Sequence, residues 1–181
     1  MKLLRTIRLD PSDTFVFEKA AEPGEWAVSG AFAFWHRDPD TLQGKARAAF
    51  RGGFLSVESL GWSTLVQIVE ADESDRARVV ATLAQQLLSH FSAPDIAAAT
   101  AAAEDEVAFA CSLCNQPQDT LIAVHRGFDE SGELRETFRT LRAREGQKPA
   151  RAFSFLEVEG EDEQPAEQVD LIAMAREDKG A

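Results

Sequence analysis

Residues 72–115 read DESDRARVVATLAQQLLSHFSAPDIAAATAAAEDEVAFACSLCN, and this stretch predicts two consecutive α-helices. The first, over residues 74–91, begins after acidic residues of the kind that cap helix N-termini and stabilise the first turn. Its apolar residues recur at spacings of three and four, which places them on one face. These residues are Val79, Val80, Leu83, Ala84, Leu87, Leu88 and Phe91. The first helix is therefore amphipathic and needs another layer to pack against.

The second predicted helix covers residues 95–115 and follows Pro94, a residue that a first helical turn accepts. Because the connection is short, the two helices should be neighbours that run antiparallel or cross steeply. Residues 96–103 are rich in alanine and have little bulk. We therefore expect the closest contact of the fold to lie along this part of the second helix.

The sequence on both sides of the helix pair predicts β-strands joined by turns, as at the Asp129-Glu-Ser-Gly132 turn signal. The leucine and phenylalanine spacing after that turn also fits a helix, but alternating Thr and Arg favour a hairpin. The predicted strands cover residues 3–9, 14–17, 26–35, 54–60, 62–70, 120–128, 133–142 and 152–158, with a short helix within 38–51. The fold class is therefore α+β: a mostly antiparallel twisted sheet built from hairpins, with the helix pair on one face.

The chain length of 181 residues fits one domain, which we place at residues 1–160. The net charge is −12, and residues 157–181 contain nine acidic and two basic residues. Residues 161–181 are therefore predicted to be an acidic C-terminal tail. An acidic protein repels phosphate backbones, so nucleic acid is not an expected partner.

The amino-terminal residues do not form a signal peptide, and no apolar stretch reaches the length of a membrane span. We expect a cytoplasmic protein with no membrane partner. In that compartment thiols stay reduced, so the two cysteines should not form a structural disulfide.

Five segments spread over nearly the whole chain can be read together. They are RTIRLDPSDTFVF (5–17), GFLSVESLGWSTLVQIVE (53–70), TLIAVHR (120–126), FRTLR (138–142) and AFSFLEVEG (152–160). Together they resemble an uncharacterised family of alphaproteobacterial proteins. The resemblance implies a bacterial, cytosolic, single-domain protein and carries no activity, cofactor or catalytic residue.

Cys111 and Cys114 form a C-x-x-C motif at the end of the second predicted helix. Redox motifs of this kind draw their reactivity from a helix N-terminus, so the position favours two inert buried thiols. A metal site is the alternative, but it needs two more ligands, and among the histidines only His125 can be expected nearby. These three residues are the candidate metal ligands.

Glu106 falls within the apolar arc of the second helix, where an unpaired charge is costly. One interpretation is a salt bridge to Arg126 or Arg139 of the predicted hairpin, or a carboxylate that reaches solvent at the edge of the arc. The other is a carboxyl group of raised pKa in a pocket between the sheet and the helices. For an enzyme, the candidate catalytic residues are Glu106, His125 and Arg126.

Two further features point to binding. Arg126, Arg135, Arg139 and Arg142 form a locally basic stretch and are the candidate binding residues. Three tryptophans, Trp26, Trp35 and Trp62, are many for a small sheet to cover, which suggests burial against a second copy or another protein. The alternative is that residues 38–51 and the tail cover that face.

The sequence contains no phosphate-binding loop, dinucleotide fingerprint, nucleophile elbow or H-E-x-x-H motif. We therefore expect a non-catalytic cytosolic accessory or protein-binding module that has no cofactor. Its expected partner is another protein or a second copy, as in a homodimer. A small-molecule enzyme or ligand-binding protein with a pocket at Glu106 is the main alternative, and a Cys/His metal-binding protein is a minor one.

Overall fold

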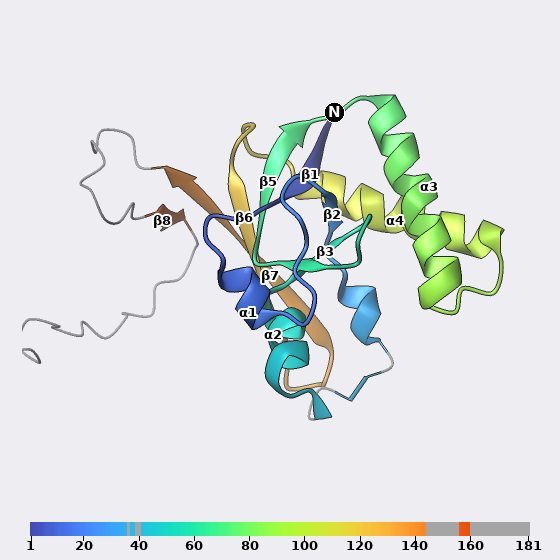
Figure 1. Cartoon of the computed structure of the whole chain (residues 1–181), viewed down its shortest axis with the longest axis horizontal. Helices are drawn as coiled ribbons and strands as arrows, with labels where there is room; N and C mark the ends of the chain where they lie inside the picture. Colours follow the sequence, from blue (N-terminus) through green and yellow to red (C-terminus); the bar gives the residue numbers. More distant parts are fainter. Residues whose placement is uncertain (36, 39–40, 144–155, 160–181) are drawn as a thin grey trace, which may run out of the picture.

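The computed structural model describes residues 1–35, 37–38, 41–143 and 156–159. It confirms an α+β fold, with eight strands in one sheet in the order β4-β3-β2-β1-β5-β6-β7-β8 (Figure 1). Every paired neighbour in the sheet is antiparallel. The strands are β1 (Lys2–Ile7), β2 (Trp26–Val28), β3 (Phe54–Ser56), β4 (Trp62–Ser63), β5 (Leu65–Glu70), β6 (Leu121–Phe128), β7 (Leu134–Ala143) and β8 (Leu156–Glu159).

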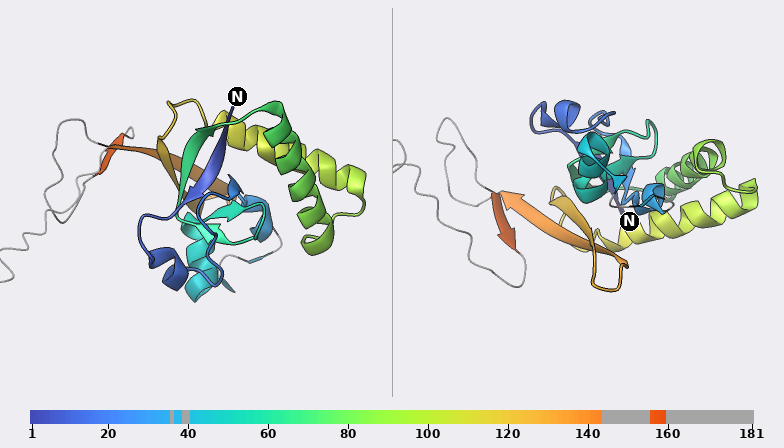
Figure 2. Two further views of the ribbon diagram at one scale, coloured as in Figure 1. Left: turned by 45° about the horizontal axis from the view of Figure 1, so that its top comes forward. Right: turned by 90° about the horizontal axis from the view of Figure 1, so that it is seen from below.

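The predicted helix pair is present as α3 (Glu73–His90) and α4 (Ile96–Ser112). Asp72 caps α3 in a reciprocal capping box with Asp75, and Asp95 caps α4 by accepting a hydrogen bond from the backbone N–H of Ala98 at 2.8 Å. The two helices pack on each other, and α4 lies against β1 and β2. Both views of Figure 2 place this pair to one side of the strands. In the described part of the chain, no helix is long and apolar enough to cross a membrane.

The alanine-rich part of α4 is the close contact that the sequence predicts. Ala99 and Ala103 are fully buried, as are Val107 and Ala110 one and two turns later. They belong to one core with Leu3 and other residues of the sheet. A small side chain at these positions lets the helix backbone approach β1 and β2 closely.

Two predicted strands are wrong. Residues 14–17 lie in or directly after a short helix, α1 (Ser12–Val16), because the carboxylate of Asp13 turns inward and is bound there. The strand predicted over residues 26–35 ends at Val28, and a 3-10 helix, η1 (Ala31–Phe34), follows. Gly30 makes this change of direction in the left-handed region, with a φ of 78°.

The remaining elements agree in outline with the sequence. The short helix within residues 38–51 is α2 (Gly44–Gly52), and β6 and β7 form the predicted hairpin. The strand predicted over 152–158 is described only in part, as β8. The predicted acidic tail, residues 161–181, lies outside the described residues.

Candidate functional site

A buried arginine occupies the point where four segments of the fold meet. Arg126 lies on β6 and is 1% exposed. Its Nη1 donates to the backbone carbonyls of Phe50 (3.1 Å) and Gly53 (2.7 Å), at the end of α2. Its Nη2 donates to the carbonyl and, at 3.1 Å, to the hydroxyl of Ser29, just after β2.

The fifth donor of Arg126 binds the neighbouring strand. Its Nε lies 2.7 Å from Oε1 of Glu136, the residue directly opposite on β7. The hydroxyl of Ser29 donates to the same carboxylate oxygen. An arginine side chain carries five N–H donors, so Arg126 has every donor occupied.

Glu106 approaches this group from helix α4 but forms no bond with the guanidinium. Its Oε2 is buried and has no hydrogen-bond partner among the described residues. The predicted salt bridge to Arg126 is therefore absent, since the arginine has no donor left to give. Arg139, the other predicted partner, is exposed on β7.

The pKa of Glu106 is raised to about 7 from its ordinary value of 4.5. Burial is the largest cause, and the negative charge of Glu136 adds to it. The positive charge of Arg126 and the backbone N–H of Gly30 oppose the shift but do not cancel it. The guanidinium of Arg126 is hydrogen-bonded to Glu136 alone of the two carboxyl groups, and Glu106, whose Oε2 has no hydrogen-bond partner among the described residues, holds its proton near neutral pH. A group of this kind can accept or donate a proton.

His125 does not join this group. Residues that alternate along a strand point to opposite faces, so His125 lies on the other face of β6 from Arg126, and it is exposed. The proposed combination of Glu106 with His125 is therefore not brought together by the fold. The fold does bring Glu106 and Arg126 together.

The four candidate binding arginines do not form one surface. Arg126 is buried, whereas Arg135 and Arg139 are exposed. Arg135 forms ion pairs with Asp129 at 2.7 Å and with Glu133 at 3.8 Å. Arg142 lies near the end of β7, in register with Glu157 of β8.

The two cysteines lie at the C-terminal end of α4, as the sequence predicts, and both are free. Cys114 is buried, and its Sγ donates to the carbonyl of Ala110 at 3.3 Å. Burial raises the pKa of the Cys114 thiol to about 12 and also raises the pKa of Cys111. Within the described residues, no group of three or more His, Cys, Asp or Glu side chains is placed to hold a metal ion.

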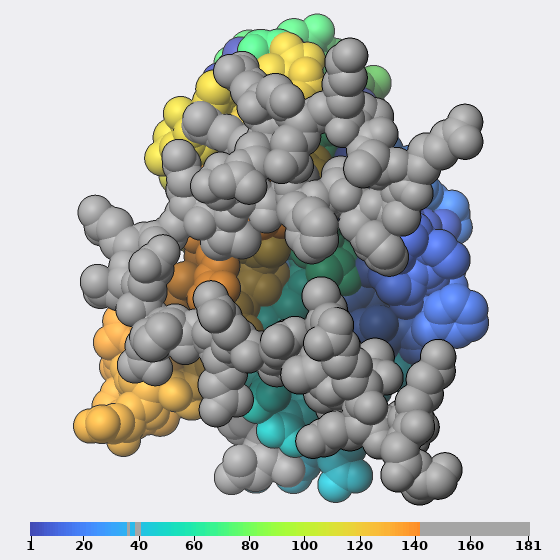
Figure 3. All heavy atoms as spheres, turned by 90° about the vertical axis from the view of Figure 1, so that its left-hand side faces the viewer, coloured from blue at the N-terminus to red at the C-terminus, as the bar shows by residue number. Residues whose placement is uncertain are grey.

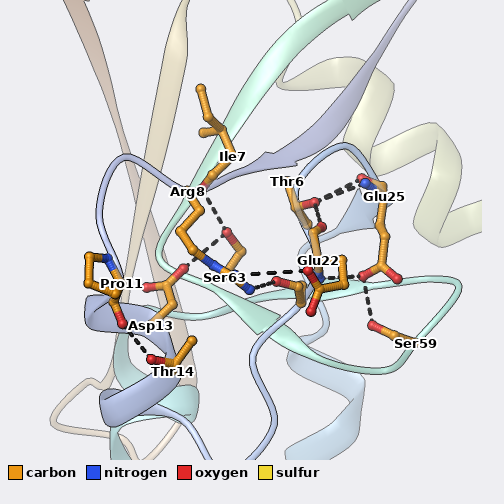
Figure 4. A network of polar contacts seen from close by, with 11 residues as sticks. Thr6, Ile7, Arg8, Pro11, Asp13, Thr14, Glu22, Glu25, Ser59 and Ser63 are labelled. Carbon is orange, nitrogen blue, oxygen red and sulfur yellow. Dashed lines mark hydrogen bonds and ion pairs between the residues drawn. The ribbon is translucent and has the colours of Figure 1, made fainter.

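A second polar network fixes helix α1 to the sheet (Figure 4). Oδ2 of Asp13 accepts from the backbone N–H of Thr64 at 3.2 Å and from the hydroxyl of Ser63 at 3.4 Å. Oδ1 of Asp13 accepts from the hydroxyl of Thr64. Next to it, Arg8 binds the carbonyl of Ala21 at 2.5 Å. The network holds α1 in a fixed orientation.

That orientation leaves large apolar side chains in solvent. Phe15 is 73% exposed and Leu9 60% exposed, and Val16 is also exposed. We call Leu9, Phe15 and Val16 the α1 surface. The three tryptophans differ from one another: Trp26 is buried beneath the guanidinium of Arg5, Trp62 is half-buried, and Trp35 is 73% exposed.

A cleft of about 210 Å³ lies between the end of α1, η1 and α2. Phe34, Leu55 and Trp62 are among its apolar lining residues, and the charged lining residues are Glu18, Arg37 and Lys45. Glu106 does not line it, so this cleft is not the pocket predicted between the sheet and the helices.

Comparison with known proteins adds the family and nothing about activity. Residues 1–155 match the model of a family of unknown function, DUF6505. The chain belongs to this family. No curated protein and no solved structure matches the chain.

Sequence reasoning missed several residues of the buried group. Glu136 had an approximate signal, because a hairpin with its turn at 129–132 places residue 126 opposite residue 135, one residue from the observed partner, residue 136. No sequence signal points to Ser29 or to the carbonyls of Phe50 and Gly53, since they approach Arg126 from segments more than 70 residues away in the chain.

Proposed function

We propose that this protein is a non-catalytic protein-binding module and that the α1 surface is its partner-binding surface. The observation that carries the proposal is the exposure of Leu9, Phe15 and Val16 within eight consecutive residues. Single exposed apolar residues are ordinary on any protein, but three in one short segment, one of them a largely exposed phenylalanine, favour a binding surface.

The way α1 is anchored supports the same proposal. Asp13 is buried and hydrogen-bonded to Ser63 and Thr64, so the helix that carries Phe15 and Val16 is held rigidly before any partner binds. A preorganised surface loses less conformational entropy on association. In Figure 3, the blue atoms of the N-terminal part protrude at one edge of the face shown.

The partner in this proposal is another protein, and self-association is the competing outcome. A cytosolic accessory role in an alphaproteobacterial cell belongs to the same proposal. It is supported by the resemblance of the five sequence segments and by two free cysteines, which suit a reducing compartment.

The test compares wild-type protein with Phe15→Asp as baits for partners from native cytosol, quantified by mass spectrometry. Leu88→Asp is the matched control, because Leu88 is an exposed apolar residue on a different helix, α3. We expect at least one partner that Phe15→Asp loses and Leu88→Asp retains, with unchanged thermal stability in both. Identical partner sets for all three baits, or a wild-type dimer by light scattering that Phe15→Asp dissociates, would reject a heterologous partner at this surface.

A second candidate function is acid–base or ligand chemistry at Glu106, favoured by its unpartnered Oε2 and raised pKa. The test is carbodiimide-coupled amine labelling at pH 6.5, located by peptide mass mapping. Labelling of Glu106 in the folded protein would mean that small molecules reach the carboxyl group. Labelling of the exposed Glu104 without Glu106 would exclude a reachable site.

A further inference from the structure

The cleft between α1, η1 and α2 has the size of a site for a small ligand. Its volume of about 210 Å³ equals the liquid volume of about seven water molecules. Pockets for drug-sized ligands and cofactors usually exceed about 300 Å³. A dinucleotide is therefore too large, whereas a single ring with a short side chain fits.

The floor of the cleft is aromatic and already packed. The ring centroids of Phe34 and Trp62 lie 5.2 Å apart, and the two ring planes are inclined at 35°. The ring of Phe34 also packs edge-on against Phe50, with the two ring centroids 5.3 Å apart, and this contact holds the Phe34 ring in place. Leu55 and Leu60 extend the same apolar lining. A flat or branched apolar group would gain contact here without displacing the walls.

The rim of the cleft is charged, with two cations and one acid. Arg37 and Lys45 are exposed, and neither side chain forms an ion pair or hydrogen bond with any other residue that the structure describes. Glu18 is the acidic lining residue. The charge of the lining residues is thus positive, on a chain whose net charge is −12. Cations that have no partner among the described residues, beside an apolar lining, are complementary to an anion with an apolar body.

We propose that this cleft binds a small organic carboxylate that carries one aromatic ring or a branched alkyl chain. The apolar group lies against Phe34 and Trp62, and the carboxylate pairs with Arg37 and Lys45. The ligand is a free small molecule, and its binding does not depend on the partner proposed for the α1 surface.

The experiment uses the full chain and follows the tryptophan indole N–H signals by two-dimensional NMR during titration with 3-phenylpropionate. Trp62→Phe assigns the Trp62 signal. We expect a saturable shift of that signal, and binding of the neutral 3-phenylpropionamide that is weaker by about five-fold, the effect of two exposed ion pairs. Absence of a saturable shift up to millimolar concentrations, or equal binding of the amide, would overturn the proposal.

Two pairs of variants locate the binding. Ala46→Leu places a larger side chain on the cleft lining, whereas Ala48→Leu makes the same change elsewhere on α2. We expect only the first to abolish binding. Lys45→Glu should weaken phenylpropionate binding more than Arg47→Glu, which changes the net charge equally but does not line the cleft. Equal effects within either pair would contradict a site in this cleft.

Discussion

At Glu106, burial and neighbouring charges act in opposite directions on one carboxyl group. Desolvation and the charge of Glu136 favour the protonated form, while Arg126 favours the ionised form. Desolvation has the larger effect on the pKa of Glu106, because the five N–H donors of Arg126 already bind Glu136, Ser29 and two backbone carbonyls. The ionised form of Glu106 would place a largely buried charge on a carboxylate whose Oε2 has no hydrogen-bond partner among the described residues.

This imbalance predicts a pH-dependent stability that Glu106→Gln removes. The folded pKa, about 7, lies above the ordinary value of 4.5, so the native state binds more protons than the unfolded state between these values. The free energy of unfolding therefore falls as the pH rises from about 4.5 to about 7, by about 3 kcal/mol in total. Glu106→Gln should be more stable than wild type at pH 8, by about 1–3 kcal/mol, with little gain at pH 4.5.

Urea denaturation across this pH range measures the effect. The control is Glu104→Gln, an exposed carboxylate on the same helix, which should keep the wild-type pH profile. A Glu106→Gln profile that runs parallel to the wild-type profile would contradict the assignment.

Two glycines in the left-handed region predict different outcomes for the same substitution. Gly30 and Gly24 have φ values of 78° and 87°, so alanine is strained at both. A Cβ at Gly30 would lie 2.5 Å from Cβ of Leu55, whereas one at Gly24 would meet nothing within 4 Å. We expect Gly24→Ala to cost about 1 kcal/mol and Gly30→Ala to cost about 1–3 kcal/mol more. Thermal denaturation of the two variants compares them directly, and equal melting temperatures would show that Leu55 moves aside freely.

At the scale of elements, the alanines of α4 determine how closely the helix approaches the sheet. Ala103 is fully buried, and the preceding Ala102 is exposed. Leucine has a high helix propensity, so Ala102→Leu should leave stability nearly unchanged. Ala103→Leu must push α4 away from the core and should cost about 1–3 kcal/mol. Chemical denaturation measures both, and a neutral Ala103→Leu would mean that the contact is not close-packed.

The elements also show which local patterns were misleading. The extended pattern of residues 14–17 predicts a strand, yet Asp13 directs this segment into helix α1 by binding Ser63 and Thr64. The strand at residue 26 was recognisable, but its end at Val28 depends on how tightly Gly30 packs against Leu55 and Trp62. In both places a contact with a segment distant in sequence overrides local propensity.

At the scale of the whole molecule, Arg126 joins the hairpin β6–β7 to the segments after β2 and at the end of α2. Arg126→Met would leave the carboxylate of Glu136 without its cation and several backbone carbonyls without this donor, and we expect a loss of about 3–5 kcal/mol in the free energy of unfolding. Arg126→Lys should lose much of the same stability, because one ammonium group cannot reproduce the fork of five donors.

The control for this prediction is Arg139→Met, an exposed arginine on the same hairpin, which should change stability by no more than about 0.5 kcal/mol. Urea denaturation compares the three variants. If Arg126→Met is as stable as Arg139→Met, the buried hydrogen bonds do not hold these segments together.

The sequence by itself determined the α+β class, the two packed helices, the β6–β7 hairpin, the partial burial of Glu106 and the burial of Cys114, because periodicity and turn signals are local properties of the chain. The tertiary structure alone decided that Arg126 binds Glu136 rather than Glu106, that Asp13 exposes Phe15, and that Arg37 and Lys45 stand beside an aromatic cleft. Those outcomes depend on contacts between residues that are distant in the sequence. In a buried site each hydrogen-bond donor can be used only once, so the contacts exclude one another.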